Sequence, residues 1–463
     1  MLTYTFDQAG KACLYEQLYG FIKGDILRGN LKPGERLPSK RKLAENLSVS
    51  VITVENAYSQ LIAEGYIQSA EKRGYFVAQV DEVLPSPEKA VTIPIPEEPE
   101  YFVDFKSNHI SQEQFPFSVW AKMMRHEILE QDKKLLQPQK YNGVAELRSA
   151  IADYLYHARG MSVHPEQVLI GSGTEYLYTL LIQLLGRDKV YAVEDPGYQK
   201  IAKIYSANNA QYRPIPIDRH GLSVRRLRET DVDVVHISPT HHFPTGIVTP
   251  IPRRQELLRW AGEVPGRYII EDDYDSEFRF TGRPIPTLFS IDDLEKVIYI
   301  NTFSKTIAPS IRISYLILPP SLLAQYREKL GFYTCTVPSF EQYTLAQFIA
   351  QGNFEQHISR MKKRYRTQRD AVIDAIKESP LADRCTIFEE DAGLHFLMHL
   401  DTTVPDSVLK QRALEHSVRI ACLTDYVYQD NPIYDHVLVV NYTGIDVSKL
   451  PEALYRLAAV LGE

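Results

Sequence analysis

Long hydrophobic runs and clustered cysteines are both missing from this sequence. No stretch approaches the roughly 18 consecutive apolar residues of a membrane-spanning helix, and the N-terminus lacks the basic start and apolar run of a signal peptide. The four cysteines are scattered without the spacing of a zinc site or a disulfide framework: Cys13, Cys335, Cys385 and Cys422. We therefore expect no membrane partner, no metal centre and a reducing, cytoplasmic location.

A strong surplus of basic charge is also absent. The net charge is −7 for the whole chain, with +2 in residues 1–80 and −9 in the remainder. The N-terminal part alone could approach an anion, but so small a surplus is weak support for nucleic-acid binding. A chain of 463 residues is long enough for about two to four domains.

A proline-rich stretch divides the chain. Little helical periodicity is present between residues 79 and 100, which is typical of an extended linker, and the prolines there are Pro85, Pro87, Pro94, Pro96 and Pro99. We place an N-terminal domain at residues 1–80, the linker at 81–100 and a C-terminal domain at 101–463.

The N-terminal domain has the pattern of a winged helix-turn-helix. Apolar residues at helical spacing predict a helix that starts near Leu14 and stops before Gly29. Ser39 can cap a short helix over 40–47, and a longer helix begins at Ser50 or Thr53. Residues 66–80 alternate around a charged tip, which predicts a two-stranded wing.

Such motifs place the start of the second helix in the major groove, while basic and hydroxyl groups hold the phosphates. We predict that Thr53 and Asn56 face the base edges of double-stranded operator DNA. The predicted phosphate contacts are Arg36, Ser39, Lys40, Arg41, Lys72 and Arg73. The alternative is a small helical module whose basic face is merely solvated.

Two segments of this domain, "PGERLPSKRKLAENLSVS" (33–50) and "AYSQLIAEGYI" (57–67), resemble the winged helix of the GntR family of bacterial regulators. Members of that family usually carry an arginine directly after the turn serine, where this chain has Val51. The resemblance implies DNA binding, and the departure affects which operator is recognised.

The C-terminal domain alternates β-rich apolar runs with helical patterns, which predicts an α/β fold with a mainly parallel sheet. Ligands bind at the carboxyl ends of the strands in such sheets. Residues with useful chemistry follow successive predicted strands: Gly173 and Thr174, Tyr198, His241, Asp272 and Tyr274, and Ser304 and Lys305.

These residues together suit pyridoxal phosphate. The turn at Gly173 offers backbone N–H groups to a phosphate, and Arg312 offers a fixed positive charge. Asp272 suits a protonated ring nitrogen, and Lys305 suits a Schiff base with an aldehyde. Each residue alone has a plainer interpretation, such as a surface lysine or a capping aspartate, and only their joint occurrence favours the cofactor.

Residues 101–463 resemble the fold-type I aminotransferase family, notably in "IEDDYDSEF" and "NTFSKTIAPSIRISYLILP". The resemblance implies a smaller α+β subdomain beside the sheet and an internal-aldimine lysine at Lys305. It implies that Asp272 contacts the pyridine nitrogen and Tyr274 the ring hydroxyl, with Tyr198 stacked on the ring and His241 near it. It assigns the phosphate to Gly173, Thr174, Ser304 and Arg312.

A GntR-type winged helix followed by an aminotransferase-like domain resembles the MocR/GabR family of bacterial transcription regulators. That resemblance implies a head-to-tail homodimer whose large domain senses an effector. Substrate-gripping arginines of related proteins are replaced here, at Lys200 and at the aligned position Asn441. The tyrosine that reaches a neighbouring phosphate is replaced by Pro138, with Tyr141 out of register.

We therefore predict a regulator that senses pyridoxal phosphate, or an amine or amino acid, through a lysine aldimine. The alternatives are a working aminotransferase with an accessory DNA-binding domain, and a large domain that only dimerises. A basic run at 359–370 is interpreted as the solvated face of a helix, with a second DNA contact as its alternative.

Overall fold

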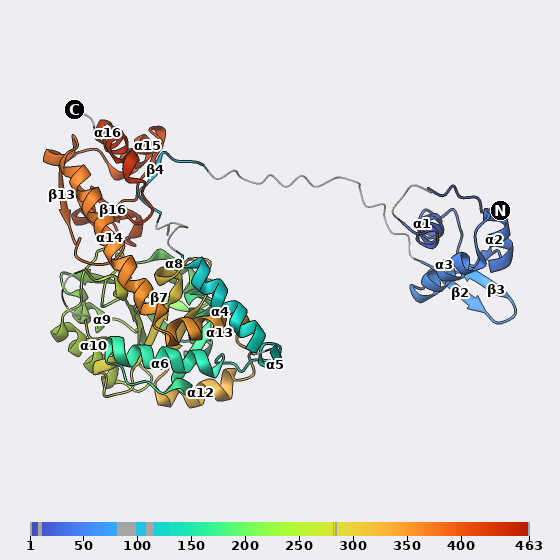
Figure 1. Cartoon of the computed structure of the whole chain (residues 1–463), viewed down its shortest axis with the longest axis horizontal. Helices are drawn as coiled ribbons and strands as arrows, with labels where there is room; N and C mark the ends of the chain where they lie inside the picture. Colours follow the sequence, from blue (N-terminus) through green and yellow to red (C-terminus); the bar gives the residue numbers. More distant parts are fainter. Residues whose placement is uncertain are drawn as a thin grey trace. The chain divides into compact units, whose positions relative to one another are not determined.

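The computed structural model describes residues 2–7, 12–80, 99–107, 115–130, 132–280, 282 and 285–461. The chain divides into two compact units, Met1–Glu98 and Pro99–Glu463, and each is considered by itself (Figure 1). Most of the predicted linker, residues 81–98, lies outside the described residues. No helix in the described ranges is long and apolar enough to cross a membrane.

The smaller unit is a three-helix winged fold. Its strands pair in the order β1-β3-β2, and its apolar core contains Leu18, Ile22, Val54, Tyr58 and Leu61. The elements are α1 (Leu14–Leu27), β1 (Arg36–Leu37), α2 (Lys40–Leu47), α3 (Val51–Ala63), β2 (Ile67–Ala70) and β3 (Gly74–Val77). The predicted helices and wing are confirmed, and β1 is an additional strand that pairs with β3.

Capping explains where the two short helices begin. The Ser39 hydroxyl accepts a hydrogen bond from the Lys42 N–H at 3.4 Å, and the Ser50 hydroxyl accepts one from the Thr53 N–H at 3.0 Å. Between them Ser48 ends α2 in the left-handed conformation, with φ of 53°. The turn is therefore tight, and α3 starts at Ser50 rather than at Thr53.

The larger unit is built on an eight-stranded sheet in the order β5-β12-β11-β10-β9-β6-β7-β8. Strands β12 and β8 run against their neighbours, and the other six run in one direction. The strands are β5 (Val168–Gly171), β6 (Val190–Asp195), β7 (Gln211–Asp218), β8 (Gly221–Leu222), β9 (Val234–Ile237), β10 (Tyr268–Asp272), β11 (Val297–Thr302) and β12 (Ser314–Ile317). The predicted mainly parallel α/β sheet is confirmed.

Helices pack around this sheet, and α4, α6 and α13 lie together beside it (Figure 1). The helices before the long α14 are α4 (Phe117–Glu130), α5 (Asp132–Leu135), α6 (Ala145–Arg159), α7 (Thr174–Leu185), α8 (Gln199–Ala207), α9 (Val224–Leu227), α10 (Ile251–Glu263), α11 (Phe303–Thr306), α12 (Pro320–Leu330) and α13 (Ser339–Ala350). Their buried apolar faces form continuous cores with the strands.

A smaller α+β lobe follows α14 (Asn353–Lys377), as predicted. Its antiparallel sheet has the order β13-β14-β16, and a short parallel pair joins β15 to β4. The remaining elements are β4 (Val103–Asp104), β13 (Cys385–Phe388), β14 (His395–Leu400), α15 (Asp406–Glu415), β15 (Val418–Arg419), β16 (Val437–Asn441) and α16 (Leu450–Val460).

Candidate functional site

The carboxyl ends of β5, β6, β9, β10 and β11 share one edge of the large sheet, because these strands run in the same direction. The loops that follow them carry the residues singled out by sequence. The chain therefore brings the predicted set to one edge, where open α/β sheets bind their ligands.

A positively charged site, called the cup below, lies where β5 turns into α7 and consists of Gly173, Thr174 and Arg312. Gly173 has φ of +95°, and a Cβ at this position would overlap the guanidinium of Arg312. Arg312 donates to Oε2 of Glu175 at 3.0 Å, and Lys200 donates to Oε1 of the same carboxylate. The two cations therefore converge beside the first turn of α7, where Thr174 begins the helix.

Lys305 lies in the short helix α11, directly after β11. Its side chain is half-buried, and burial lowers the pKa of its amine, while the charge of Asp275 opposes that shift. A lysine with a lowered pKa has more of its amine unprotonated, which is the nucleophilic form.

Asp272 ends β10 and is buried. Its Oδ2 accepts a hydrogen bond from the hydroxyl of Tyr178, and His236 Nε2 lies 3.6 Å from the same oxygen. His236 is itself fixed through Nδ1, 2.8 Å from the Tyr205 hydroxyl. The second oxygen, Oδ1, is buried without a hydrogen-bond partner in the described part of the chain, so this carboxylate can receive a proton donor from a ligand.

His241 and Asp275 form a buried pair beside Tyr274. Nδ1 of His241 lies 2.9 Å from Oδ2 of Asp275 and 3.3 Å from the Tyr274 hydroxyl. Burial would lower the pKa of His241, but the charge of Asp275 and the hydrogen bond to it outweigh burial and raise it. Burial also raises the pKa of Tyr274, with Asp275 adding to the effect, so the phenol stays protonated.

Tyr198 and Ser304 occupy different surroundings. The Tyr198 side chain is 46% exposed and packs perpendicular to Phe243, with ring centroids 5.7 Å apart. The Ser304 hydroxyl donates to the Ile311 carbonyl at 2.7 Å, so its proton is already used within the chain.

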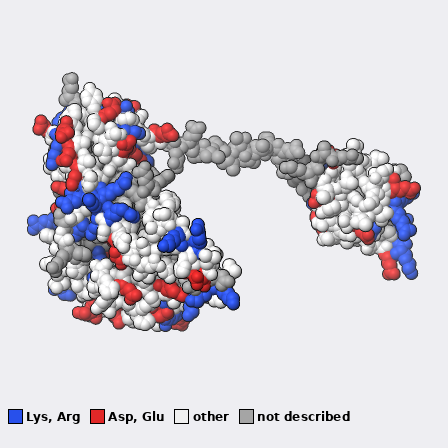
Figure 2. Space-filling view, in the orientation of Figure 1, with Lys and Arg blue, Asp and Glu red and all other residues white. Residues whose placement is uncertain are grey.

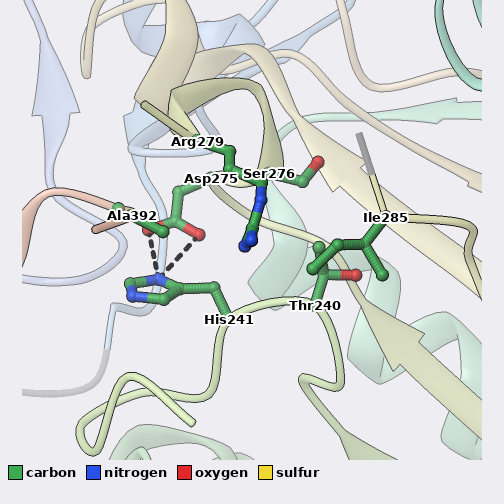
Figure 3. Close-up of a pocket in the computed structure, with 8 residues that line it drawn as sticks. Thr240, His241, Asp275, Ser276, Arg279, Ile285 and Ala392 are labelled. Atoms are coloured by element: carbon green, nitrogen blue, oxygen red, sulfur yellow. Dashed lines mark hydrogen bonds and ion pairs between the residues drawn. The ribbon is translucent and has the colours of Figure 1, made fainter. Parts of the chain in front are cut away.

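A small pocket adjoins His241 (Figure 3). Asp275 and Arg279 project towards it from the segment after β10, and the Gly393 segment of the smaller lobe closes another side. The remaining lining residues are Thr240, Ser276, Ile285 and Ala392. The pocket therefore lies where the two lobes of the larger unit meet.

The positions that depart from related proteins are engaged within the chain. Asn441 is buried, and its amide donates to the Lys106 carbonyl at 2.8 Å. Lys200 is paired with Glu175, and the Tyr141 hydroxyl accepts from Arg327 Nε at 2.9 Å. Neither Lys200 nor Asn441 is therefore free to act in place of an arginine.

The predicted DNA contacts lie on the surface of the smaller unit, where Lys and Arg side chains gather at one edge (Figure 2). Arg36, Arg41, Lys72, Arg73 and Asn56 are exposed. Two of the predicted DNA-contacting side chains already have partners within the chain. Lys40 lies 2.5 Å from Oε1 of Glu55, and the Thr53 hydroxyl lies 2.8 Å from that of Ser50. Ser39 is used as the cap of α2.

The basic run at 359–370 lies in α14 of the larger unit, and basic side chains cover this part of its surface (Figure 2). Arg360, Lys363, Arg364 and Arg366 are exposed, whereas Arg369 is buried and donates to the Glu390 carbonyl. The exposed members agree with a solvated helix face.

Sequence reasoning did not single out several residues that support the site. Tyr178 and His236 orient Asp272, Asp275 orients His241, and Glu175 joins Lys200 to Arg312. One signal was available for Tyr178, because it follows Thr174 by four residues and so lies on the same face of α7. The other pairings join segments that are distant in sequence.

The donor set fits pyridoxal phosphate on two structural observations. Asp272 keeps a buried oxygen free for a protonated ring nitrogen, and the cup of Gly173, Thr174 and Arg312 combines backbone N–H groups with a guanidinium. Lys305 supplies an amine of lowered pKa at the same sheet edge.

Comparison with known proteins gives two families. Residues 14–77 match bacterial regulatory proteins of the gntR family, and residues 101–440 match aminotransferase class I and II. The chain is 39% identical over 449 residues to an uncharacterized HTH-type transcriptional regulator, YdeL, of Bacillus subtilis, covering 96% of each chain. It is 31% identical to the probable rhizopine catabolism regulatory protein MocR of Rhizobium meliloti, covering 97% of this chain and 94% of that one.

Among solved structures, the larger unit resembles the kynurenine aminotransferase of Pyrococcus horikoshii in complex with PMP. The TM-score is 0.67 at 25% identity, covering 78% of this chain and 90% of that one. The aminotransferase fold is thus found for the larger unit, and the regulators YdeL and MocR match along nearly the whole chain.

Proposed function

The chain belongs to the MocR-type family of bacterial transcription regulators, which join a GntR winged helix to an aminotransferase-like domain, and we propose that it reads a ligand at Lys305 and reports it to operator DNA. The observation that carries this proposal is the convergence of Lys305, Asp272 and the Arg312 cup on one sheet edge of a protein that also carries a winged helix.

The proposed cofactor is pyridoxal phosphate, which supplies an aldehyde that amines can attack and a ring that withdraws electrons. Asp272, oriented by Tyr178, would hold the ring nitrogen. Gly173, Thr174 and Arg312 would hold the phosphate, and Ser304 would join them through its oxygen. Tyr198 would cover one ring face, while Tyr274 and His241 would face the ring hydroxyl.

The absence of two arginines that bind the substrate carboxylate in related proteins favours sensing over efficient turnover. An aminotransferase must hold the carboxylate of two successive substrates. At the two positions where related proteins place arginines, Lys200 is paired with Glu175 and Asn441 is bound to the main chain. A ligand that binds one domain arrangement better than another shifts their populations and so changes how DNA is held.

DNA recognition is assigned to α3 and the wing. Asn56 offers an amide to base edges, and Ile52, which is 68% exposed near the start of α3, offers an apolar surface of the kind that contacts thymine methyl groups. Arg36, Arg41, Lys72 and Arg73 would hold phosphates, with Lys40 exchanging Glu55 for DNA.

A homodimer is proposed from apolar exposure on the larger unit. Leu129 on α4 is 73% exposed, Leu136 after α5 is 81% exposed and Phe332 after α12 is 76% exposed. Apolar side chains of this size are commonly covered by a partner, and a second copy of the chain is the proposed partner. A sedimentation measurement of the full chain tests it.

The visible absorption spectrum of the purified full chain with pyridoxal phosphate tests the cofactor assignment, with Lys305→Ala as the variant. The expected result is a cofactor band that depends on Lys305 and resists dialysis. A band equal in both proteins would refute the role of Lys305. Release of keto acid at several turnovers per minute from an added amino acid would instead favour the enzyme alternative.

A further inference from the structure

The pocket beside His241 has a feature that the cofactor does not explain. Three polar atoms that belong to its lining residues are buried without a hydrogen-bond partner in the described residues: Thr240 Oγ1, His241 Nε2 and Arg279 Nε. Buried polar groups in native proteins are almost always paired, so several unpaired ones around one cavity indicate a missing ligand or solvent. In the view of Figure 3 the Arg279 side chain lies between Asp275 and Thr240, above His241.

The charges around this pocket select the kind of ligand. Asp275 is compensated by His241, since the two are hydrogen-bonded and the pKa of His241 is raised. Arg279 makes no ion pair with an acidic side chain in the parts of the chain that the structure describes. The charge of Glu389 also acts on the pKa of His241. The feature that selects the ligand is therefore the guanidinium of Arg279 itself, whose planar fork matches a carboxylate.

The pocket is also close to Lys305. His241, Asp275 and Lys305 follow the adjacent strands β9, β10 and β11, so they lie at the same end of the sheet. In agreement with this, the charge of Asp275 acts on the pKa of both His241 and Lys305. A small molecule with its amino group towards Lys305 can therefore extend a second polar group into the pocket.

We propose that Arg279, with Thr240 and His241, binds the carboxylate of an amino-acid effector. The inference rests on the proposed function, because it assumes that the effector amine meets the cofactor at Lys305. In this proposal Arg279, from another part of the fold, takes over the role of the two arginines that are missing at positions 200 and 441. The effector is then an amino acid rather than an amine without a carboxylate. Arg279 is then a specificity-determining residue, and Thr240 is a second, neutral contact.

The test uses the full chain loaded with pyridoxal phosphate. The common L-amino acids, β-alanine and γ-aminobutyrate are titrated while the visible absorption is followed, and the best responder is compared with the amine that lacks its carboxylate. Each is measured on the original protein, on Arg279→Gln and on Thr240→Val. Arg225→Gln, at an exposed arginine in α9, is the matched control.

The expected result is half-saturation by the amino acid at a concentration about 10- to 100-fold lower than by its amine, the range of a charge-assisted carboxylate pair. Arg279→Gln should remove most of this preference, Thr240→Val a smaller part and Arg225→Gln none. Equal response to acid and amine, an unchanged preference in Arg279→Gln, or no response to any compound would each overturn the carboxylate site.

The cofactor band before any effector is added separates this inference from the proposed function. If the band is absent from the original protein, the proposed function fails as well. If the band forms normally in all variants while the preference for a carboxylate is missing, only the present inference fails. Calorimetric titration of the same compounds provides a readout that does not depend on the band.

Discussion

Gly393 lies so close to His241 that a Cβ at position 393 would overlap the imidazole ring. The glycine comes from the smaller lobe and the histidine from the loop after β9, so this contact fixes the distance between two lobes at the pocket. Its φ of +76° also favours glycine. The steric contact with His241 and the positive φ therefore both restrict position 393, and an experiment can separate their effects on stability.

Gly393→Ala should destabilise the larger unit by about 1–3 kcal/mol more than a glycine change that brings backbone strain alone. Gly352→Ala is the matched control, because its φ is +73° and nothing lies within 4 Å of the added Cβ. Urea unfolding of both variants measures the difference. Equal losses of stability would show that the His241 ring moves aside without cost.

Glu175→Gln should tighten the binding of pyridoxal phosphate. The Glu175 carboxylate pairs with both Arg312 and Lys200. Without its negative charge, both cations are available to pair with the phosphate of the cofactor. Because all three side chains are about half exposed, we expect only about a threefold gain, smaller in high salt. Titration followed by absorption measures it, with the exposed Glu229→Gln as control. Weaker binding in Glu175→Gln would mean that the pair instead holds the cup in shape.

Stability should fall between pH 6.5 and 8 because of Glu194. Burial raises the pKa of Glu194 to about 8 and lowers that of the neighbouring His242 to about 3. A carboxyl with a raised folded-state pKa binds more protons folded than unfolded, so its contribution is complete below its ordinary pKa and declines up to about pH 8. His242 acts oppositely, but only below its ordinary pKa of 6.5.

Glu194→Gln should therefore remove a decline of about 1.5 kcal/mol in the free energy of unfolding across that interval. Chemical unfolding at several pH values measures it. The raised pKa values of Glu271 and Glu277, both about 7, affect the original protein and the variant alike, so the difference between them isolates Glu194. Parallel pH curves would contradict the prediction.

Lys72 and Arg73 at the tip of the wing should bind DNA phosphates. Replacing Lys72 and Arg73 together by alanine should weaken binding to a random-sequence duplex and reduce the slope of log K against log salt by about 2, since each phosphate contact contributes about 0.9. Lys363→Ala on α14 is the comparison, and no change is expected there if that helix face is only solvated. A reduced slope in Lys363→Ala would establish the second DNA contact.

Much of this arrangement is readable in the sequence, because local patterns determine it. Ser39 and Ser50 cap their helices by contacts within three residues, and Asp272 and Lys305 lie at the ends of β-rich apolar runs that favour strands. The parallel direction of those strands then brings their ends together. The reversed β12 was not anticipated, since nothing local distinguishes an antiparallel strand buried on both faces from a parallel one.

The long-range pairings could not be read in this way. His241 contacts Asp275 and Gly393, which are 34 and 152 positions further along the chain, and Glu175 at the start of α7 meets Lys200 in α8 and Arg312 before β12. The contact with Gly393 depends on how the smaller lobe packs on the sheet, and the others depend on how the segments after neighbouring strands meet. Local patterns predict which chemical groups are present, whereas the position of Arg279 at the pocket depends on contacts between distant segments.

Asp273, the residue after Asp272, is held on the opposite side of the strand end. Its Oδ2 accepts hydrogen bonds from Arg159 at 2.8 Å, from Tyr299 at 2.7 Å and from Ser276 at 2.8 Å. Since consecutive residues of a strand face opposite ways, the end of β10 is anchored from both sides. The backbone that carries the Asp272 carboxylate is therefore held in place by contacts that Asp272 itself does not make.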